Sequence, residues 1–115
     1  ESWKNTGVIY VQNSRTKQML PHNFQFYTDF KHNENRFSIK RAVQNLNIPQ
    51  LIVHGSDDST VLVKEARAIN SWNAKSELFI VEDADHVFGA KHPWEKKRMP
   101  NDLKSVVNRT MDFLE

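Results

Sequence analysis

Two short apolar runs separated by a helix-length segment constrain the fold of this chain most strongly. The first run, Gln50–His54, carries leucine, isoleucine and valine at consecutive positions instead of alternate ones. This pattern is typical of a strand buried on both faces of a parallel sheet. Glu77–Glu82 is a second apolar run of strand length. Between the runs, apolar residues recur at helical spacing, at Leu62, Ala66, Ile69 and Trp72. A strand, a helical crossover and a second strand predict a right-handed parallel βαβ unit.

Further helices are predicted on both sides of this unit. Ser38 can cap a helix that runs to about Leu46, and Pro49 prevents its continuation. A final helix is expected from about Asp102, whose carboxylate suits the positive first turn. The apolar face of this last helix is formed by Leu103, Val106, Val107, Thr110, Met111 and Leu114. The predicted fold class is therefore α/β, with a parallel βαβ unit and flanking helices.

The first third of the chain gives weaker signals. Gly7–Val11 predicts a short strand or extended segment, and the following residues 12–35 are polar and mixed, with Pro21 interrupting them. Four aromatic residues crowd into this stretch, Phe24, Phe26, Tyr27 and Phe30. They are expected either to pack beneath a loop or short helix, or to form an apolar wall over a substrate pocket.

The composition excludes several classes of protein. The chain has 16 Lys and Arg against 14 Asp and Glu, so its overall charge does not predict an anionic partner. The basic run Lys91–Arg98, which contains Trp94, is too short to predict nucleic-acid binding. The absence of cysteine excludes disulfides, thiolate metal ligands and a cysteine nucleophile within the chain. No apolar run approaches the roughly 18 residues of a membrane span, and the cytoplasm is the default compartment.

Ionisable side chains follow both predicted strands. Asp57 and Asp58 come after the first strand and Gly55, and His86 comes after the second. Because the carboxyl ends of parallel strands share one edge of a sheet, with neighbours about 4.8 Å apart, an aspartate and the histidine can meet there. A carboxylate that orients an imidazole, whose other nitrogen takes a proton from a hydroxyl, makes two thirds of a catalytic triad. His54 is expected to be structural, with its ring hydrogen-bonded at the top of the sheet.

Both loops resemble sequence signatures of the α/β-hydrolase family. The segment His54–Val61 reads His-Gly-Ser-Asp-Asp-Ser-Thr-Val, which is similar to the family's acid loop His-Gly-x-x-Asp-x-x-Val. The segment Asp83–Phe88 reads Asp-Ala-Asp-His-Val-Phe, which is similar to the family's histidine loop Gly-Ala-Asp-His-x-Phe. The helix-length gap between the two segments also fits that family.

The resemblance implies a role for each loop and a division of the chain. Asp58 would be the acid of the triad and His86 the general base, while Asp57 would shape the turn. Residues 49–115 would form the C-terminal βαβα portion of an α/β-hydrolase sheet, and residues 1–48 a lid, a cap or a connecting segment. The implied enzyme is a serine hydrolase of esterase, dienelactone-hydrolase-like or prolyl-oligopeptidase-like type. It would act on a small-molecule ester or amide and need no cofactor.

The nucleophile of that family has no counterpart in this chain. It lies on a Gly-x-Ser-x-Gly turn, whereas the only glycines here are Gly7, Gly55 and Gly89, and no serine lies between two of them at that spacing. We therefore expect a C-terminal fragment that is inactive alone and whose partner is the N-terminal part of the same enzyme. An Asp or Cys nucleophile would instead give dehalogenase, epoxide-hydrolase or dienelactone-hydrolase chemistry.

Two other interpretations stay open. A non-catalytic interaction module with a hydrolase-like half fold would use an open sheet edge and the aromatic-rich segment as contact surfaces. An uncovered parallel strand also predicts self-association. A metal site built from His54, Asp57, Asp58 and His86 is not predicted, because the sequence lacks a helical His-x-x-x-His or similar ligand spacing.

Overall fold

The structure is a computed structural model that describes residues 1–115. The residues form two compact units, Glu1–Ile39 and Lys40–Glu115. The elements of the first unit are α1 (Ser2–Thr6), β1 (Val8–Gln12), β2 (Met19–Asn23) and α2 (Phe24–His32). The elements that follow are α3 (Ile39–Gln44), β3 (Gln50–Gly55), α4 (Val63–Trp72), β4 (Ser76–Val81) and α5 (Asn101–Leu114).

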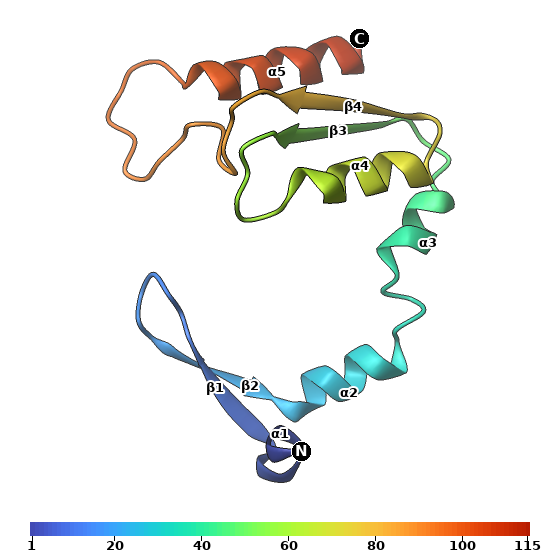
Figure 1. Ribbon diagram of the computed structural model, residues 1–115, viewed down its shortest axis with the longest axis vertical. Coiled ribbons are helices and arrows are strands. Elements are labelled where there is room, and N and C mark those ends of the chain that lie inside the picture. Colours follow the sequence, from blue (N-terminus) through green and yellow to red (C-terminus); the bar gives the residue numbers. More distant parts are fainter. The chain divides into compact units, whose positions relative to one another are not determined.

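The second unit contains the predicted parallel pair of strands with its helical crossover. β3 and β4 pair in parallel, in continuous register from Gln50 opposite Ser76 to Gly55 opposite Val81. Helices α4 and α5 both contact the two strands. Figure 1 shows the strands between these helices, with both arrowheads pointing to the same side. The chain is therefore of mixed α/β content, with a small parallel sheet in the second unit.

A small core holds the second unit together. Its buried apolar residues are Val43, Ala66, Val81 and Ala84, and no large side chain is fully buried. The expectation that the first predicted strand is buried on both faces is wrong, because the residues of β3 up to His54 are only half-buried. The sheet has two strands, so each strand has one neighbour and one open edge.

Helix α3 belongs to the second unit almost entirely. Val43 on this helix is buried, and the Nζ atom of Lys40 lies 5.9 Å from the centroid of the Trp72 ring on α4. The boundary between the compact units therefore falls between Ile39 and Lys40, earlier in the chain than the boundary after residue 48 that the sequence suggested.

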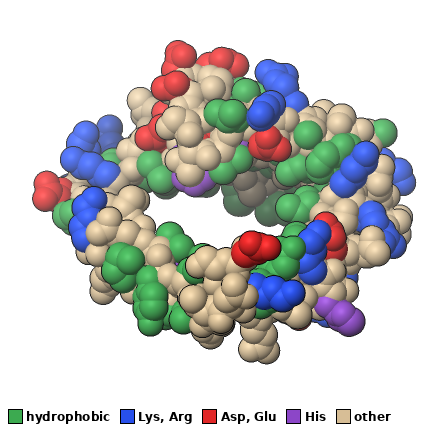
Figure 2. Space-filling model, turned by 60° about the horizontal axis from the view of Figure 1, so that its bottom comes forward, with side chains coloured by type: hydrophobic (Ala, Val, Ile, Leu, Met, Phe, Trp, Pro, Cys, Tyr) green, Lys and Arg blue, Asp and Glu red, His purple; other side chains and the backbone are tan.

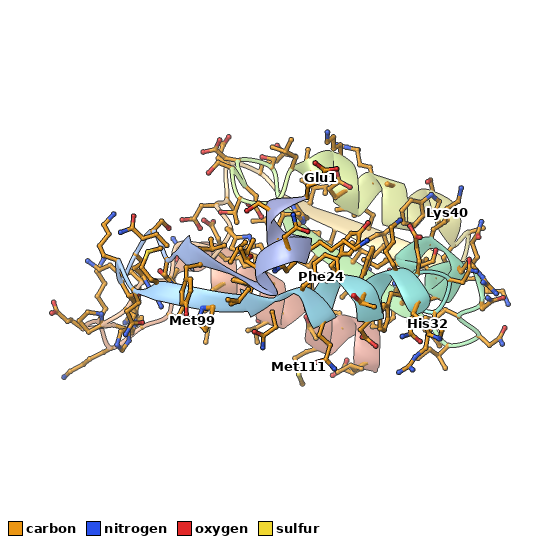
Figure 3. All side chains as sticks on the ribbon, turned by 90° about the horizontal axis from the view of Figure 1, so that it is seen from below. Glu1, Phe24, His32, Lys40, Met99 and Met111 are labelled. Atoms are coloured by element: carbon orange, nitrogen blue, oxygen red, sulfur yellow. The ribbon has the colours of Figure 1, made fainter.

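Helix α5 covers the sheet with only part of its predicted apolar face. Leu103 and Val106 are half-buried, whereas Val107, Met111 and Leu114 are exposed. Met111 is labelled on this helix in Figure 3. A sheet of two strands is narrow. It therefore covers only part of the apolar face of α5, and the residues at one side of that face and in its last turn stay exposed.

The first unit is built on an antiparallel hairpin that the sequence did not predict. β1 pairs with β2, from Val8 opposite Asn23 to Gln12 opposite Met19. The expected strand at β1 is confirmed, but Pro21, which was expected to interrupt the following stretch, lies within β2. Proline lacks a backbone N–H and is tolerated where a strand edge has no neighbour. Each strand of a two-stranded ribbon has such an edge, so Pro21 fits opposite Tyr10.

Aromatic rings pack at the base of this hairpin. The Trp3 and Phe24 rings meet edge to face with centroids 5.6 Å apart, and the Phe24 and Tyr27 centroids are 5.4 Å apart. The Trp3 indole N–H also donates a hydrogen bond to the His22 carbonyl, at 2.8 Å. The expectation that the aromatic residues of this stretch pack beneath a loop or short helix is wrong, because they lie on α2 itself and Phe26, Tyr27 and Phe30 are exposed. The other, an apolar wall over a substrate pocket, stays a prediction.

Apolar side chains remain visible on the surface of the molecule. On the face drawn in Figure 2, hydrophobic side chains lie in the open among Lys, Arg, Asp and Glu side chains of both signs. Exposed examples in the first unit are Tyr10 and Phe26, and in the second unit Ile48 and Leu62. None of the helices combines the length and the apolar character that crossing a lipid bilayer requires.

Candidate functional site

The loop after β3 is folded around the carboxylate of Asp58. Its Oδ1 atom accepts hydrogen bonds from the backbone N–H groups of Thr60 and Val61, each at 2.8 Å. An aspartate that bonds the backbone two and three residues ahead is a common way to close a turn. The side chain of Asp58 is 4 % exposed, so these bonds hold a buried carboxylate in one orientation.

The surroundings of Asp58 keep it ionised. Burial by itself raises the pKa of this carboxyl group. The opposing effects are hydrogen bonds from the backbone N–H groups of Val61 and Thr60 and from the His86 ring, together with attraction to that ring. These bonds favour the charged form. They outweigh burial, so the pKa of Asp58 lies below its ordinary value.

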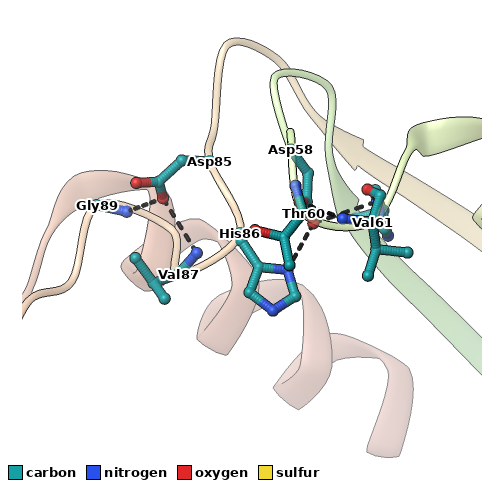
Figure 4. A network of polar contacts seen from close by, with 8 residues as sticks. Asp58, Thr60, Val61, Asp85, His86, Val87 and Gly89 are labelled. Atoms are coloured by element: carbon teal, nitrogen blue, oxygen red, sulfur yellow. Dashed lines mark hydrogen bonds and ion pairs between the residues drawn. The ribbon is translucent and has the colours of Figure 1, made fainter. Parts of the chain in front are cut away.

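A second aspartate shapes the loop after β4. Asp85 Oδ1 accepts hydrogen bonds from the N–H groups of Val87, at 3.1 Å, and Gly89, at 2.8 Å. The backbone carbonyl of Asp85 also accepts from the N–H of Phe88, at 3.2 Å. Figure 4 shows the two bonds of the Asp85 carboxylate and, on the other side of the loop, the His86 ring beside Asp58. The sequence resemblance contained Asp85 as part of a motif but gave no role for its side chain.

The two loops are held together by their backbones. The N–H of Ser56 donates to the Val81 carbonyl at 2.9 Å, and the N–H of Asp57 donates to the Ala84 carbonyl at 3.0 Å. In return, the Asp83 N–H donates to the Ser56 hydroxyl at 2.8 Å. Asp57 is exposed and contributes its backbone to this connection, which agrees with the expectation that it shapes the turn.

Gly55 is the position where the loops approach most closely. A Cβ atom at this residue would overlap the backbone carbonyl of Ala84 and crowd that of Asp85. Ala84 itself is 0 % exposed. The absence of a side chain at Gly55 therefore lets the histidine loop cross directly over the end of β3. This crossing places the residue before His86 against the start of the acid loop.

The predicted contact between Asp58 and His86 is present. His86 Nδ1 lies 2.8 Å from Asp58 Oδ2 (Figure 4). Because an ionised carboxylate only accepts hydrogen bonds, Nδ1 carries the proton in this contact. In the neutral ring, Nε2 is then unprotonated. No residue of the chain is hydrogen-bonded to Nε2, and the His86 side chain is 51 % exposed. The ring is thus fixed at one nitrogen and accessible at the other.

His54 is a third member of this cluster. Its Nε2 donates to the Val61 carbonyl at 2.8 Å and lies 3.4 Å from Asp58 Oδ2. The ring is 13 % exposed. The expectation that His54 is hydrogen-bonded at the top of the sheet is confirmed. Its approach to Asp58 was missed, because a strand residue and a loop residue four positions later do not meet in any regular local structure.

The side chains of the cluster do not form a metal centre. No group of three or more His, Cys, Asp or Glu residues in the structure is arranged to hold a metal ion. The Asp58 oxygens already accept hydrogen bonds from N–H groups, and Asp57 is exposed.

The chain contains a carboxylate and an oriented imidazole, and no hydroxyl group is hydrogen-bonded to that imidazole. A scan against protein-family models and a search of the curated proteins both found no match for this chain. The resemblance to α/β-hydrolases therefore stays a prediction from the two loop sequences.

Proposed function

We propose that Asp58 and His86 are the acid and the general base of a hydrolase of the α/β-hydrolase type, which acts on small-molecule esters or amides. The observation that carries this proposal is the 2.8 Å contact between His86 Nδ1 and a buried, ionised carboxylate, with Nε2 left accessible. An imidazole held in this tautomer is ready to accept a proton at Nε2.

The nucleophile in this proposal is a serine hydroxyl supplied by a polypeptide segment other than residues 1–115, most simply the N-terminal part of the same enzyme. His86 Nε2 takes the hydroxyl proton as the oxygen attacks the carbonyl carbon of the substrate. Asp58 stabilises the resulting imidazolium through Nδ1. His86 then gives the proton to the departing alcohol or amine, and water releases the acyl group by the reverse sequence.

The open edges of the β3–β4 sheet support a partner of this kind. An uncovered strand presents unpaired backbone N–H and C=O groups that a further parallel strand can bond. Both site loops leave the sheet at the carboxyl ends of the strands, where doubly wound sheets bind their ligands. A nucleophile on a turn after an added strand would come to the same edge.

Ester hydrolysis by the chain with and without such a segment tests this proposal. Residues 1–115 alone should give no saturable hydrolysis of p-nitrophenyl butyrate. The same chain joined to the segment that its gene encodes before Glu1 should give saturable turnover. Turnover by the 115-residue chain alone that disappears in His86→Ala would show that the nucleophile lies within it and would contradict the proposal.

A non-catalytic interaction module is the second candidate. It is favoured by the apolar side chains left exposed on the second unit, such as Val107 and Met111, together with the open strand edges. This candidate predicts concentration-dependent self-association of the chain in sedimentation velocity experiments. It also predicts that the chain joined to the upstream segment has no esterase activity. A monomer at high concentration would count against it.

A further inference from the structure

The segment between β4 and α5 contains a cluster of cations beside the histidine loop. Figure 1 shows this segment as the long orange loop that leads into α5. The loop borders an open hollow of about 700 Å³, whose lining includes Gly89, Lys91, Trp94, Lys96, Lys97 and Arg98. The lining contains no aspartate and no glutamate. The Asp85 and Asp102 carboxylates lie beside Gly89, so the hollow combines four positive side chains with negative charge only at its Gly89 end.

The cations of this hollow have no ion-pair partners in the chain. The carboxylates that form ion pairs are bonded to other residues, as Glu77 is to Arg109 and Glu34 to Lys31. Lys96 has an aromatic neighbour within the same loop: its Nζ atom lies 6.0 Å from the centroid of the Trp94 ring. Like charges gathered in one concavity raise the local positive potential, which a bound anion would lower.

The hollow also has an apolar side. Trp94 is 37 % exposed and Met99 is 48 % exposed, and both belong to its lining. Met99, the residue before Pro100 at the start of α5, is labelled in Figure 3. Arg98 can hold a carboxylate or phosphate with two parallel hydrogen bonds, and an exposed indole can stack on a flat apolar group. A ligand with one anionic group and one ring would use both sides.

The hollow lies close to the proposed catalytic base. Gly89 is part of its lining, and the Gly89 N–H is held by the Asp85 carboxylate, one residue before His86. Three residues of chain span at most about 10 Å, so the Gly89 end of the hollow is within the length of a small molecule from His86.

We propose that this hollow binds the carboxylate or phosphate group of a small aromatic or apolar ligand. In the proposed hydrolase, it would select esters or amides that carry such an anionic group beside the bond that is cleaved. The selection of substrates rests on the proposed function, whereas the binding of the anion does not.

Titration of the ¹⁵N-labelled 115-residue chain with benzoate, phenyl phosphate and the neutral benzyl alcohol tests the proposal by NMR. Either anion, or both, should shift the amide signals of Gly89, Lys97 and Arg98 and the Trp94 indole signal, and lower ionic strength should tighten the binding. The two anions distinguish a carboxylate site from a phosphate site. Benzyl alcohol should bind at least tenfold more weakly than the better anion.

Charge-matched variants give the control. Lys97→Gln with Arg98→Gln should weaken binding of the better anion at least tenfold. Lys75→Gln with Arg67→Gln removes one lysine and one arginine from other exposed positions of the same unit, and should change the affinity less than twofold. Equal losses of affinity in the two double variants would show that only the net charge of the chain matters, and would overturn the proposal. Tighter binding of a ten-nucleotide thymidine strand than of either small anion would also overturn it.

The variant His86→Ala separates this inference from the proposed function. It should bind the anion as the unaltered chain does, because the anion contacts the loop after Gly89 and not the imidazole. Normal anion binding combined with a joined enzyme that does not hydrolyse esters would refute the hydrolase and leave the anion site standing. Hydrolysis of esters without anion binding would refute the inference and leave the hydrolase standing.

Discussion

The two compact units of this chain are stabilised in different ways. Every buried residue lies in the second unit, Lys40–Glu115, including the apolar core and the polar residues Asp58 and Asn73. The first unit, Glu1–Ile39, has no buried residue. It depends on a two-stranded hairpin and on ring contacts such as that of Trp3 with Phe24. Isolated hairpins of two strands are marginally stable in water.

This difference explains where fixed geometry is found. The Asp58 and His86 side chains are positioned by loops that are bonded to each other and packed over Gly55. A catalytic pair needs such support, because an imidazole that is slightly misplaced loses most of its effect. The first unit has exposed aromatic side chains, such as Tyr10 and Phe26, but no comparable support.

The largest expected effect is a difference in activity between two histidine variants, one in each unit. In the joined enzyme of the proposed function, His86→Ala should lower kcat/KM for a p-nitrophenyl ester by at least about 10³-fold, and Asp58→Asn by on the order of 10³-fold or more. His32→Ala, an exposed histidine at the end of α2, should change it less than about twofold. Equal rates for the His86 and His32 variants would remove the catalytic role of His86.

Two glycines provide a matched comparison of stability. Gly55→Ala would force a methyl group into the Ala84 carbonyl, and should lower the free energy of unfolding of the second unit by about 3 kcal/mol or more. Gly7 has a φ of +71° with open space around it. Gly7→Ala should cost about 1–2 kcal/mol, and only in the first unit. Urea denaturation followed by the amide signals of β1 and of β3 measures the stability of both units. Equal destabilisation of β3 by Gly55→Ala and by Gly7→Ala would contradict the comparison.

Removal of one ring tests how the first unit is stabilised. Trp3→Ala deletes two ring contacts and the hydrogen bond to the His22 carbonyl. Each aromatic pair contributes about 0.5–1.5 kcal/mol beyond its buried area. Amides of the β1–β2 ladder should then lose most of their protection from hydrogen exchange, while those of β3 and β4 keep theirs. Unchanged protection in the hairpin would show that its stability has another source.

The smallest expected effect is a pH dependence of stability in the second unit. The pKa of Asp58 is lower in the folded chain than its ordinary value, which is about 3.9 in unfolded peptides. The unfolded chain therefore binds this proton first as the pH falls, and ionised Asp58 stabilises the fold above about pH 4. That contribution is lost as the pH falls through the lowered pKa. The difference in urea midpoint between the unaltered chain and Asp58→Asn should narrow on acidification from pH 7 to pH 3.

The sequence predicted the features that local patterns encode. Consecutive apolar residues and a helical stripe predicted β3, α4 and β4, and the shared edge of parallel strands predicted that an aspartate meets His86. The resemblance to the acid loop of the α/β-hydrolases selected Asp58. β2 was missed because proline is tolerated on a free strand edge, and a free edge is a property of the assembled ribbon. The need for glycine at Gly55 arises from a loop that crosses it, 29 positions away at Ala84 (84 − 55). No local pattern contains that contact.

The protonation of the His86 ring tests the central claim most directly. In ¹⁵N NMR spectra of the chain at a pH where the ring is neutral, the two ring nitrogens have distinct chemical shifts that reveal which one carries the proton. The 2.8 Å contact with Asp58 predicts that the proton is on Nδ1 and that Nε2 is free to accept one. A neutral ring with its proton on Nε2 would contradict the pairing of Asp58 with His86, and with it the proposed base.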